Sequence, residues 1–385
     1  MKGKFMITAV NPAIIQWARE RSGFSLDDLA RIMGRDPNEL QQWENGESAP
    51  SYTALEELAY RHLRIPLAVF FFPIPPVVDD PKGNFRRLPE YELKRFSPDT
   101  IQKIRLAQAY QDSLEDFFMG SHPDRMIHDE IDPKKYSLEN LASNVRDYLG
   151  VSFKQQFNFQ NADKAFKYWR HALEEAGVFT FKESFKDRFL SGFCIVHDQY
   201  PVIMVNNSTS FTRQIFTLMH ELGHILYGVN GVTDADESYL EFLKKDEQKI
   251  EIQCNRFAAE LLVPTSKFKT DIPFIKEERE NAIPDLAKKY SVSREVILRR
   301  LLDFKLINND YYITQSEEWN NDYLRSKKEA TGGNWYLTKM AYLGEGFVQT
   351  AFHHYRNGKF DKVTLANHLN VKAKNLKKFE AYVGR

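Results

Sequence analysis

Several features that define other protein classes are scarce or missing in this sequence. It has only two cysteines, Cys194 and Cys254, which excludes a disulfide framework and favours a reducing compartment. No apolar run is long enough to span a membrane, and prolines interrupt the longest one, residues 67–78. The first residues, MKGKFMITAVNP, lack a long apolar segment that ends in small residues, so we expect no signal peptide. The sequence therefore predicts a cytoplasmic protein that does not contact a membrane.

An excess of one charge is also missing, because 53 Lys and Arg residues balance 53 Asp and Glu residues. Net charge alone therefore does not point to nucleic acid, and the distribution of charge along the chain is more informative. Hydrophobic residues make up 42% of the 385 residues, which is enough for real cores and argues against disorder. A chain of this length predicts two or three domains.

One stretch, residues 216–228 (FTLMHELGHILYG), has the residue types of a metal site. His220, Glu221 and His224 form a His-Glu-x-x-His pentapeptide. Residues four apart on a helix project from one face, so the two imidazoles could bind one metal ion. Glu221 would lie beside that ion, where it could accept a proton from water. Zn²⁺ prefers such ligands and keeps one position open in catalytic sites.

The pentapeptide also occurs by chance, and its setting argues against that alternative. The stretch around it is largely apolar and predicts a buried helix. Two histidines and a glutamate on a buried helix need partners, because unpaired buried polar groups are costly. A bound metal ion would supply the partner.

A third protein ligand is expected on the next predicted helix, residues 246–262. Glu251 and Glu247 lie on nearly the same edge of that helix, one turn apart. Cys254 shares this edge and could bind zinc as a thiolate, although a small buried residue is its simpler interpretation. Periodicity alone does not choose among the three.

Residues 13–63 predict four short amphipathic helices separated by turn signals. Ser25 is a plausible N-cap, and Gly34 and the Asn45-Gly46 pair are typical helix ends. The pattern Leu-Ala at 29–30, Gly34, Trp-Glu-Asn-Gly at 43–46 and a proline at position 50 resembles the helix-turn-helix domain of the lambda-repressor/Xre class. The resemblance implies an all-α domain whose third helix enters the major groove of DNA.

The charge of this domain is unfavourable for DNA. Residues 13–64 contain six basic and nine acidic residues, a net charge of −3, and phosphate neutralisation supplies much of DNA affinity. Leu26 stands where the class usually has a DNA-contacting glutamine. Asn38, Gln41 and Gln42 could still reach base edges. A protein-docking or dimerising module is the alternative, which would make the protein a homodimer.

A small β-sheet is predicted before the metal helix, with strands at residues 177–181, 190–196 and 201–206. Zinc peptidases pair the substrate main chain with an edge strand beside the metal helix, and we expect residues 201–206 (PVIMVN) to be that strand. Residues 228–236 predict a loop, whose acidic cluster is typical of a solvated surface. Residues 66–76 predict an extended, proline-rich connector.

The stretches FTLMHELGH and EIQCNRFAAELLVP together closely resemble the ImmA/IrrE family of metallopeptidases, over roughly residues 140–305. The resemblance implies that His220, His224 and Glu251 bind Zn²⁺ and that Glu221 is the general base. Cys254 stands where alanine is usual, which leaves this ligand set intact.

The reaction that the resemblance implies is metal-assisted peptide hydrolysis. Glu221 would accept the proton of the attacking water and pass it to the leaving amine. The donor that stabilises the carbonyl oxyanion is not identified by the sequence, and His197 and Tyr227 are only weak candidates for it.

Two later segments are basic. Residues 285–305 again have a helix-turn-helix pattern, with six basic and three acidic residues, and the peptidase family often carries such a segment. Residues 356–385 hold eight basic and two acidic residues. If nucleic acid is bound, these segments are better electrostatic candidates than the N-terminal domain. A helical lid and a solvated surface are the respective alternatives.

We predict a mainly α protein with a small β-sheet, of the α+β class. The expected parts are an Xre-type helix-turn-helix domain (1–75), a linker and helical connector (76–135), an ImmA/IrrE-like metallopeptidase domain (136–310) and a C-terminal helical, basic domain (311–385).

The leading hypothesis is an intracellular zinc endopeptidase fused to a regulator-like domain. The resemblance implies that it cleaves a transcriptional repressor or similar regulator in a mobile-element or stress response. The alternative is a DNA-binding regulator or antitoxin-like protein whose peptidase domain is mainly a sensor or scaffold. The expected partners are a protein substrate and, as a second candidate, DNA bound through the helix-turn-helix domain or the basic C-terminal segments.

Overall fold

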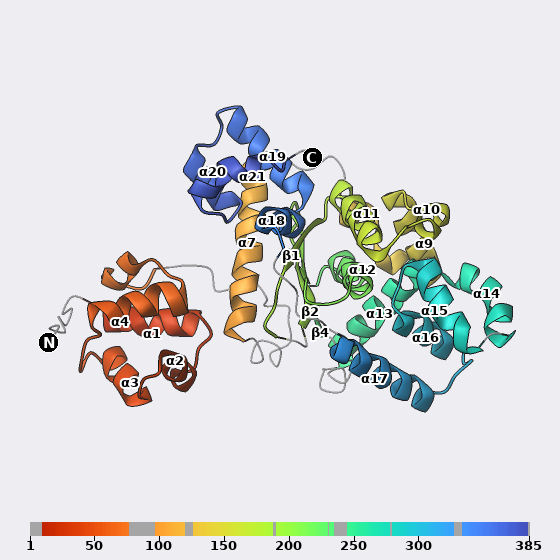
Figure 1. Ribbon diagram of the computed structural model, residues 1–385, viewed down its shortest axis with the longest axis horizontal. Helices are drawn as coiled ribbons and strands as arrows, with labels where there is room; N and C mark the ends of the chain where they lie inside the picture. Colours follow the sequence, from red (N-terminus) through yellow and green to blue (C-terminus); the bar gives the residue numbers. More distant parts are fainter. Residues whose placement is uncertain are drawn as a thin grey trace. The chain divides into compact units, whose positions relative to one another are not determined.

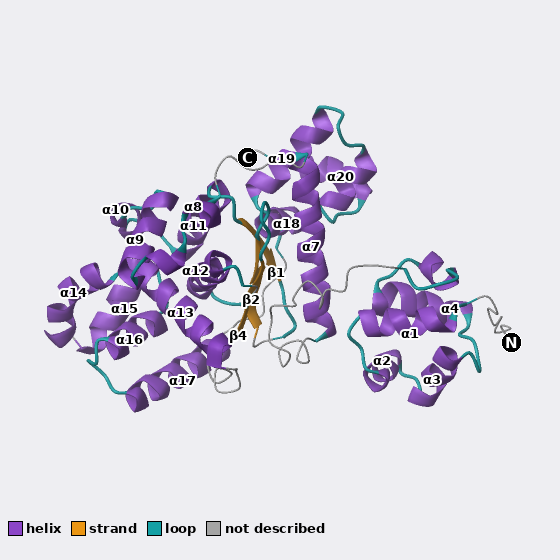
Figure 2. Cartoon of the chain, turned by 180° about the vertical axis from the view of Figure 1, so that it is seen from behind, coloured by secondary structure: helices purple, strands orange, loops and turns teal. Residues whose placement is uncertain are grey.

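The computed structural model describes residues 10–76, 97–119, 126–187, 190–229, 231–234, 245–277, 279–326 and 333–383. Contacts divide the chain into two compact units, Met1–Arg105 and Leu106–Arg385. Helices dominate both units, and a small sheet lies in the second (Figure 1, Figure 2). The predicted class, mainly α with a small β-sheet, is confirmed. Within the described residues, no helix combines the length and apolarity needed to cross a membrane.

The N-terminal unit is a bundle of short helices. Their bounds are α1 Pro12–Arg21, α2 Leu26–Met33, α3 Pro37–Asn45, α4 Tyr52–Glu56, the π-helix η1 Glu57–Leu63 and the 3-10 helix η2 Leu67–Phe71. The Ser25 side chain caps α2 by accepting from the Asp28 amide, and Gly34 and Gly46 end helices in the left-handed conformation. Residues 66–76 were predicted to form an extended connector. This prediction is wrong for residues 67–71, which form the 3-10 helix η2 directly after Pro66. A proline can precede such a short helix because its missing amide hydrogen is not needed there.

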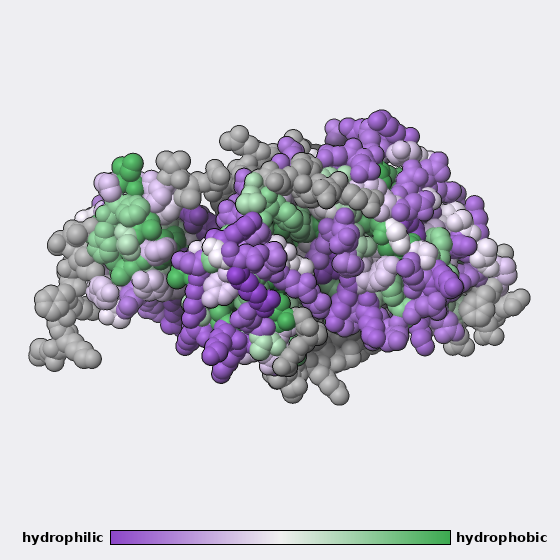
Figure 3. Space-filling model, turned by 90° about the horizontal axis from the view of Figure 1, so that it is seen from above, coloured by the Kyte–Doolittle hydropathy of each residue, from purple (hydrophilic) through white to green (hydrophobic). Residues whose placement is uncertain are grey.

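The bundle has its own apolar core, built around Leu29, Leu40, Trp43, Leu55 and Phe70. Some large apolar side chains of the unit stay on its surface, and Figure 3 shows hydrophobic side chains gathered there. The exposed ones include Ile32, Tyr52, Tyr60, Phe71, Phe72 and Ile74.

The second unit is built around a four-stranded sheet with the order β1-β3-β2-β4. The strands are β1 Phe179–Glu183, β2 Leu190–Ile195, β3 Val202–Asn206 and β4 Val232–Asp234. β3 pairs parallel with β1 and antiparallel with β2, and β4 pairs antiparallel with β2. The first three strands were predicted, whereas β4 lies in a stretch predicted as a loop.

Helices cover the sheet on both faces (Figure 1). On one face, α12 (Phe211–Tyr227) packs against β2 and β3, and α13 (Lys245–Leu262) packs in turn on α12. On the other face, Tyr110 of α7 (Pro98–Phe118) stacks on Phe181 of β1 at 4.5 Å between ring centroids. Phe347 meets the same Phe181 ring edge-on at 5.0 Å. Strands β2 and β3 are buried along their whole length as a result.

The remaining helices surround this centre and continue to the end of the chain. Before the sheet they are α8 Ile127–Glu130, η3 Pro133–Lys135, α9 Leu138–Leu149, α10 Phe153–Phe157 and α11 Ala162–Glu175. After α13 they are α14 Thr265–Glu277, α15 Arg279–Tyr290, α16 Arg294–Asp303 and α17 Asn309–Ser326. The last group is α18 Trp335–Leu343, α19 Glu345–Arg356, α20 Lys362–His368, η5 Ala373–Asn375 and α21 Leu376–Glu380.

Arg170 of α11 ties the last group of helices to the sheet. Its guanidinium donates to the Thr180 carbonyl on β1 and, at 2.8 Å, to the Ala341 carbonyl on α18. A β-carbon at Gly344 would collide with this guanidinium at 2.3 Å, so the close approach requires glycine. Helix α18 therefore packs along β1, one of the two edge strands.

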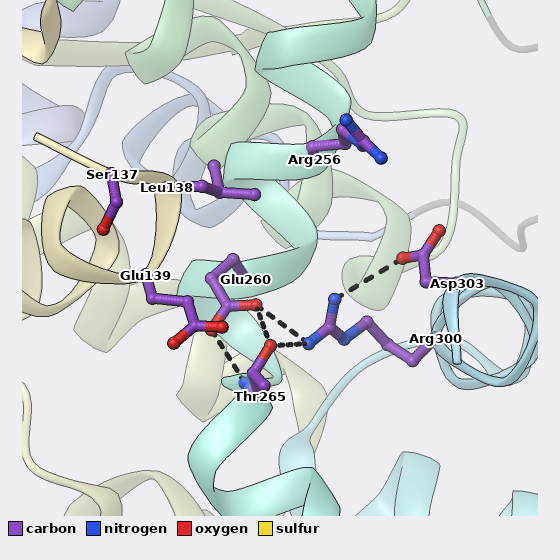
Figure 4. A pocket seen from close by; sticks show the side chains of 8 residues that line it. All are labelled: Ser137, Leu138, Glu139, Arg256, Glu260, Thr265, Arg300 and Asp303. Carbon is purple, nitrogen blue, oxygen red and sulfur yellow. Dashed lines mark hydrogen bonds and ion pairs between the residues drawn. The ribbon is translucent and has the colours of Figure 1, made fainter.

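An open pocket of about 480 Å³ lies between α9, α13, α14 and α16 (Figure 4). Its floor is an internal network in which Arg300 donates to Glu260 at 2.8 Å and to the Thr265 hydroxyl at 2.8 Å. Glu260 also accepts from the Thr265 amide, which caps the start of α14. None of the predicted site residues lines this pocket. Glu260, Thr265 and Arg300 therefore bond to one another and hold α13, α14 and α16 together.

We expect Glu260→Ala to destabilise the second unit by about 3 kcal/mol, because it leaves the buried Arg300 guanidinium without its carboxylate. The side chains of Glu260 and Arg300 are only 3% and 6% exposed. Urea unfolding followed by circular dichroism measures the effect. Glu139→Ala, an exposed glutamate at the rim of the same pocket, is the control and should unfold like the wild type. Equal stability of the two variants would contradict a structural role for the pair.

Candidate metal centre

The predicted site residues come from two helices that pack against each other. His220, Glu221 and His224 lie on α12, and Glu251 lies on α13. All four side chains are buried, at 0%, 0%, 1% and 6% exposure respectively. Helix α12 begins at the Ser210 cap and ends at Gly228 in the left-handed conformation. The pentapeptide therefore lies in the C-terminal half of a well-capped helix, which holds its side chains in place.

Three nitrogen and oxygen donors converge between the helices. The Nε2 atoms of His220 and His224 are 2.9 Å apart. The two Glu251 carboxylate oxygens lie 3.2 Å from His220 Nε2 and 3.1 Å from His224 Nε2. Ligands placed tetrahedrally about 2.0–2.1 Å from one ion are separated by roughly 3.3 Å. The spacing and chemistry of this buried His-His-Glu group therefore fit a single metal ion.

Electrostatics at the group also favour a cation. Burial raises the pKa of the Glu251 carboxyl, but the two histidines outweigh burial and hold it well below its usual range. Burial lowers the pKa of the His224 imidazole, whereas Cys254 and Glu251 together raise it well above its ordinary value. The buried carboxylate therefore requires a positive charge beside it, which a protonated histidine or a bound cation supplies.

Asn255 orients the first histidine. Its side-chain oxygen lies 2.8 Å from His220 Nδ1, so it can accept the Nδ1 hydrogen. This tautomer leaves the Nε2 lone pair directed at the cluster, as a metal ligand requires. Asn255 belongs to the second sequence motif, but only the folded arrangement shows that it contacts His220.

Both cysteines lie next to the site, and neither belongs to the converging group. The Cys194 thiol on β2 is hydrogen-bonded to Glu221, and burial and the charge of Glu221 raise its pKa well above the usual value. It therefore stays a neutral thiol that can donate to the carboxylate. Burial likewise raises the pKa of the Cys254 thiol, which lies against His224. Because the Glu251 oxygens lie among the converging donors and the Cys254 sulfur does not, the geometry favours Glu251 over Cys254.

The backbone that leads into β4 borders the second histidine. The Gly231 carbonyl accepts from the Cys194 amide at 3.1 Å. A β-carbon on Gly231 would lie 2.4 Å from the His224 ring. The start of β4 is thus directly beside the converging donors, a relation that the sequence did not predict.

Other residues singled out in the sequence have different outcomes. His197 Nδ1 accepts from the amides of Gln199 and Tyr200, both at 3.1 Å, and so holds the turn between β2 and β3. Tyr227 is half-buried at the end of α12, and burial raises its pKa. The side chain of Glu247 and the acidic residues Asp236 and Glu237 lie outside the described part of the chain.

The prediction that residues 201–206 form the substrate-binding edge strand is wrong. Strand β3 lies inside the sheet, paired with β1 on one side and β2 on the other, so its backbone groups are already bonded. The apolar run predicted a strand correctly but contains no information on strand order.

Comparison with known protein families agrees with this arrangement. Residues 173–302, which include β1 to β4, α12 and α13, match the peptidase M78 model, described as an IrrE N-terminal-like domain. Residues 15–61 match a helix-turn-helix model. The predicted combination of the two is confirmed, and the first match implies a metallopeptidase. A search of curated proteins finds no match to this chain.

We expect Asn255→Ala to weaken metal binding about 10- to 100-fold, because His220 loses the acceptor that sets its tautomer and ring orientation. Zinc affinity measured by competition with a chromophoric chelator tests this. Gln253→Ala changes an exposed residue of the same helix and should leave the affinity unchanged. If both variants bind zinc like the wild type, His220 does not depend on Asn255.

Gly231→Ala should abolish tight metal binding, because the added methyl group and the His224 ring would occupy the same space. Zinc content after dialysis, determined by mass spectrometry, is the readout. Gly333→Ala is the control, since its β-carbon would meet only the Thr338 hydroxyl at 3.9 Å. Full zinc content in a folded Gly231→Ala variant would refute the close packing of this residue on His224.

Proposed function

We propose that the protein is a zinc-dependent endopeptidase in which His220, His224 and Glu251 hold the metal and Glu221 is the general base. The observation that carries the proposal is the convergence of two imidazole nitrogens and a carboxylate within a buried space, with a second buried carboxylate next to them. The match to the M78 peptidase model supports it. We retain the four-part division of the chain and the cytoplasmic location as parts of this proposal.

In this proposal, each residue around the metal has a separate role in peptide hydrolysis. Bound zinc supplies Lewis acidity that activates water and polarises a peptide carbonyl. Glu221 accepts the proton of the attacking water and delivers it to the amine that leaves. The Cys194 thiol donates to the Glu221 carboxylate and so positions it. Asn255 keeps His220 in the tautomer that exposes Nε2.

Strand β4 is the best candidate for binding the substrate chain. Among the described strands it lies at an edge of the sheet, and it begins directly after Gly231, which touches His224. The opposite edge strand, β1, is packed against α18. An extended peptide that paired with the side of β4 that no described strand occupies would therefore run past the metal ligands. This replaces the role that the sequence suggested for residues 201–206.

The substrate class follows from the second domain. A helix-turn-helix module on the same chain as a peptidase supports a regulator, such as a transcriptional repressor, as the protein that is cleaved. The alternative, a DNA-binding regulator whose peptidase domain is a sensor or scaffold, is less favoured. In the N-terminal domain Arg19 and Arg35 are bound by Glu44 and Glu39 at 2.6 Å, so these arginines are not available to phosphates.

Glu221→Gln should reduce cleavage at least 100-fold while zinc content stays unchanged, because the amide cannot accept a proton. The measurement is mass spectrometry of new protein N-termini after the purified protein is added to a cell extract of its source. Adding a chelator should abolish the wild-type signal, and restoring zinc should recover it.

Glu175→Gln, a change at an exposed glutamate of α11, is the matched control and should cleave like the wild type. Cleavage retained by Glu221→Gln would show that another group is the base. Loss of zinc from that variant would instead assign Glu221 a part in holding the metal.

A further inference from the structure

The last helices have a third helix-turn-helix arrangement, which the proteolytic function does not use. Helices α20 and η5–α21 are separated by a short turn at residues 369–372. Asn370 adopts a φ of 48° there, the left-handed conformation that asparagine tolerates better than most residues. The Val371 amide donates to the Ala366 carbonyl at 2.9 Å and closes the turn. The buried side chains that join the two helices are Leu365, Ala366, Leu369, Leu376 and Phe379.

The turn and the second helix of this pair carry a group of exposed lysines. We call these four residues, Lys372 in the turn and Lys374, Lys377 and Lys378 in η5–α21, the C-terminal basic surface. No ion pair joins any of them to a described residue. The nearby acidic residues are engaged elsewhere: Glu380 binds Arg356 at 3.0 Å, and Asp361 caps α20 by accepting from the Thr364 amide at 2.7 Å.

The other basic segment predicted from the sequence, residues 285–305, differs in this respect. Four of its six cations are used inside the fold, and the other two, Lys288 and Lys305, are exposed. Arg300 pairs with buried Glu260, Lys289 pairs with Asp271 at 2.6 Å, Arg294 lies over the Trp319 ring at 4.6 Å and Arg299 lies over the Tyr312 ring at 5.3 Å. These four side chains therefore stabilise the second unit, whereas none of the four lysines of the C-terminal basic surface has an ion-pair or aromatic partner among the described residues.

We propose that the C-terminal basic surface binds duplex DNA, with η5–α21 placed against the major groove and its lysines against the phosphates. A helix joined to its predecessor by a short turn is the shape that enters this groove. Protein interfaces are depleted in lysine and centre on buried aromatic anchors, whereas lysine is a principal residue for phosphate neutralisation. This inference goes beyond the proteolytic function and is independent of it.

The test is fluorescence anisotropy of the full-length protein with a labelled duplex of about 30 base pairs, titrated at several salt concentrations between about 50 and 200 mM. The variant carries Lys372→Gln, Lys374→Gln, Lys377→Gln and Lys378→Gln. We expect its affinity to fall on the order of 100-fold and the salt slope to fall by about 3 to 4, because each lost phosphate contact removes about 0.9 from the slope.

A charge-matched control replaces four exposed lysines elsewhere by glutamine: Lys134, Lys154, Lys164 and Lys269. It should bind DNA like the wild type. A third variant, with Asn38, Gln41 and Gln42 changed to alanine, reports on the N-terminal domain. The lysine variant should keep its zinc content and its cleavage of protein, so that a failure of the peptidase proposal would be seen separately.

Three results would overturn the assignment. The wild type could fail to bind duplex at low salt, or the lysine variant could bind with the slope of its control. Poly-glutamate could also displace the duplex at equal charge concentration, which would indicate a general site for acidic polymers. Loss of binding in the N-terminal variant alone would assign the DNA contact to α3.

Discussion

The packing of α13 on α12 is the interaction on which the rest of the second unit depends. It brings Glu251 to His220 and His224, which precede it in the sequence by 31 and 27 residues. Gly223 permits this approach, because a β-carbon there would lie 3.1 Å from the Cys254 sulfur. The sheet supports α12 from its other side, and α14 and α16 hold the far end of α13 through Glu260 and Arg300. A bound cation would stabilise a group of polar side chains so deeply enclosed.

The same enclosure shapes the groups around the metal ligands. Asn255 contacts His220 and Cys194 contacts Glu221, and both residues come from the elements that form the enclosure. Because β2 contributes Cys194 and also holds Gly231 by a main-chain hydrogen bond, the sheet aligns β4 with the metal ligands. The proposed substrate binding and general-base catalysis would therefore both depend on β2.

Three helix-turn-helix patterns occur along the chain, and the surroundings of their charged residues separate them. In the first, arginines are paired with glutamates of the same domain. In the second, over residues 285–305, arginines pack on aromatic rings or pair with buried carboxylates. In the third, four lysines face solvent. A count of charges along the sequence treats the second and third segments alike, because it does not register which charges meet a partner in space.

Residue pattern alone determined the elements of this protein and the chemistry of its candidate site. The caps at Ser25 and Gly34, the apolar helix around His220 and the first three strands are local features, so spacing within a few residues predicts them. Strand order and the pairing of the three-residue strand β4 are not local. Only the tertiary structure decided which edge of the sheet meets the metal ligands and which candidate on α13 reaches the histidines. Both depend on contacts between residues far apart in sequence. The spacing of residues within one helix or strand gives no information on such contacts.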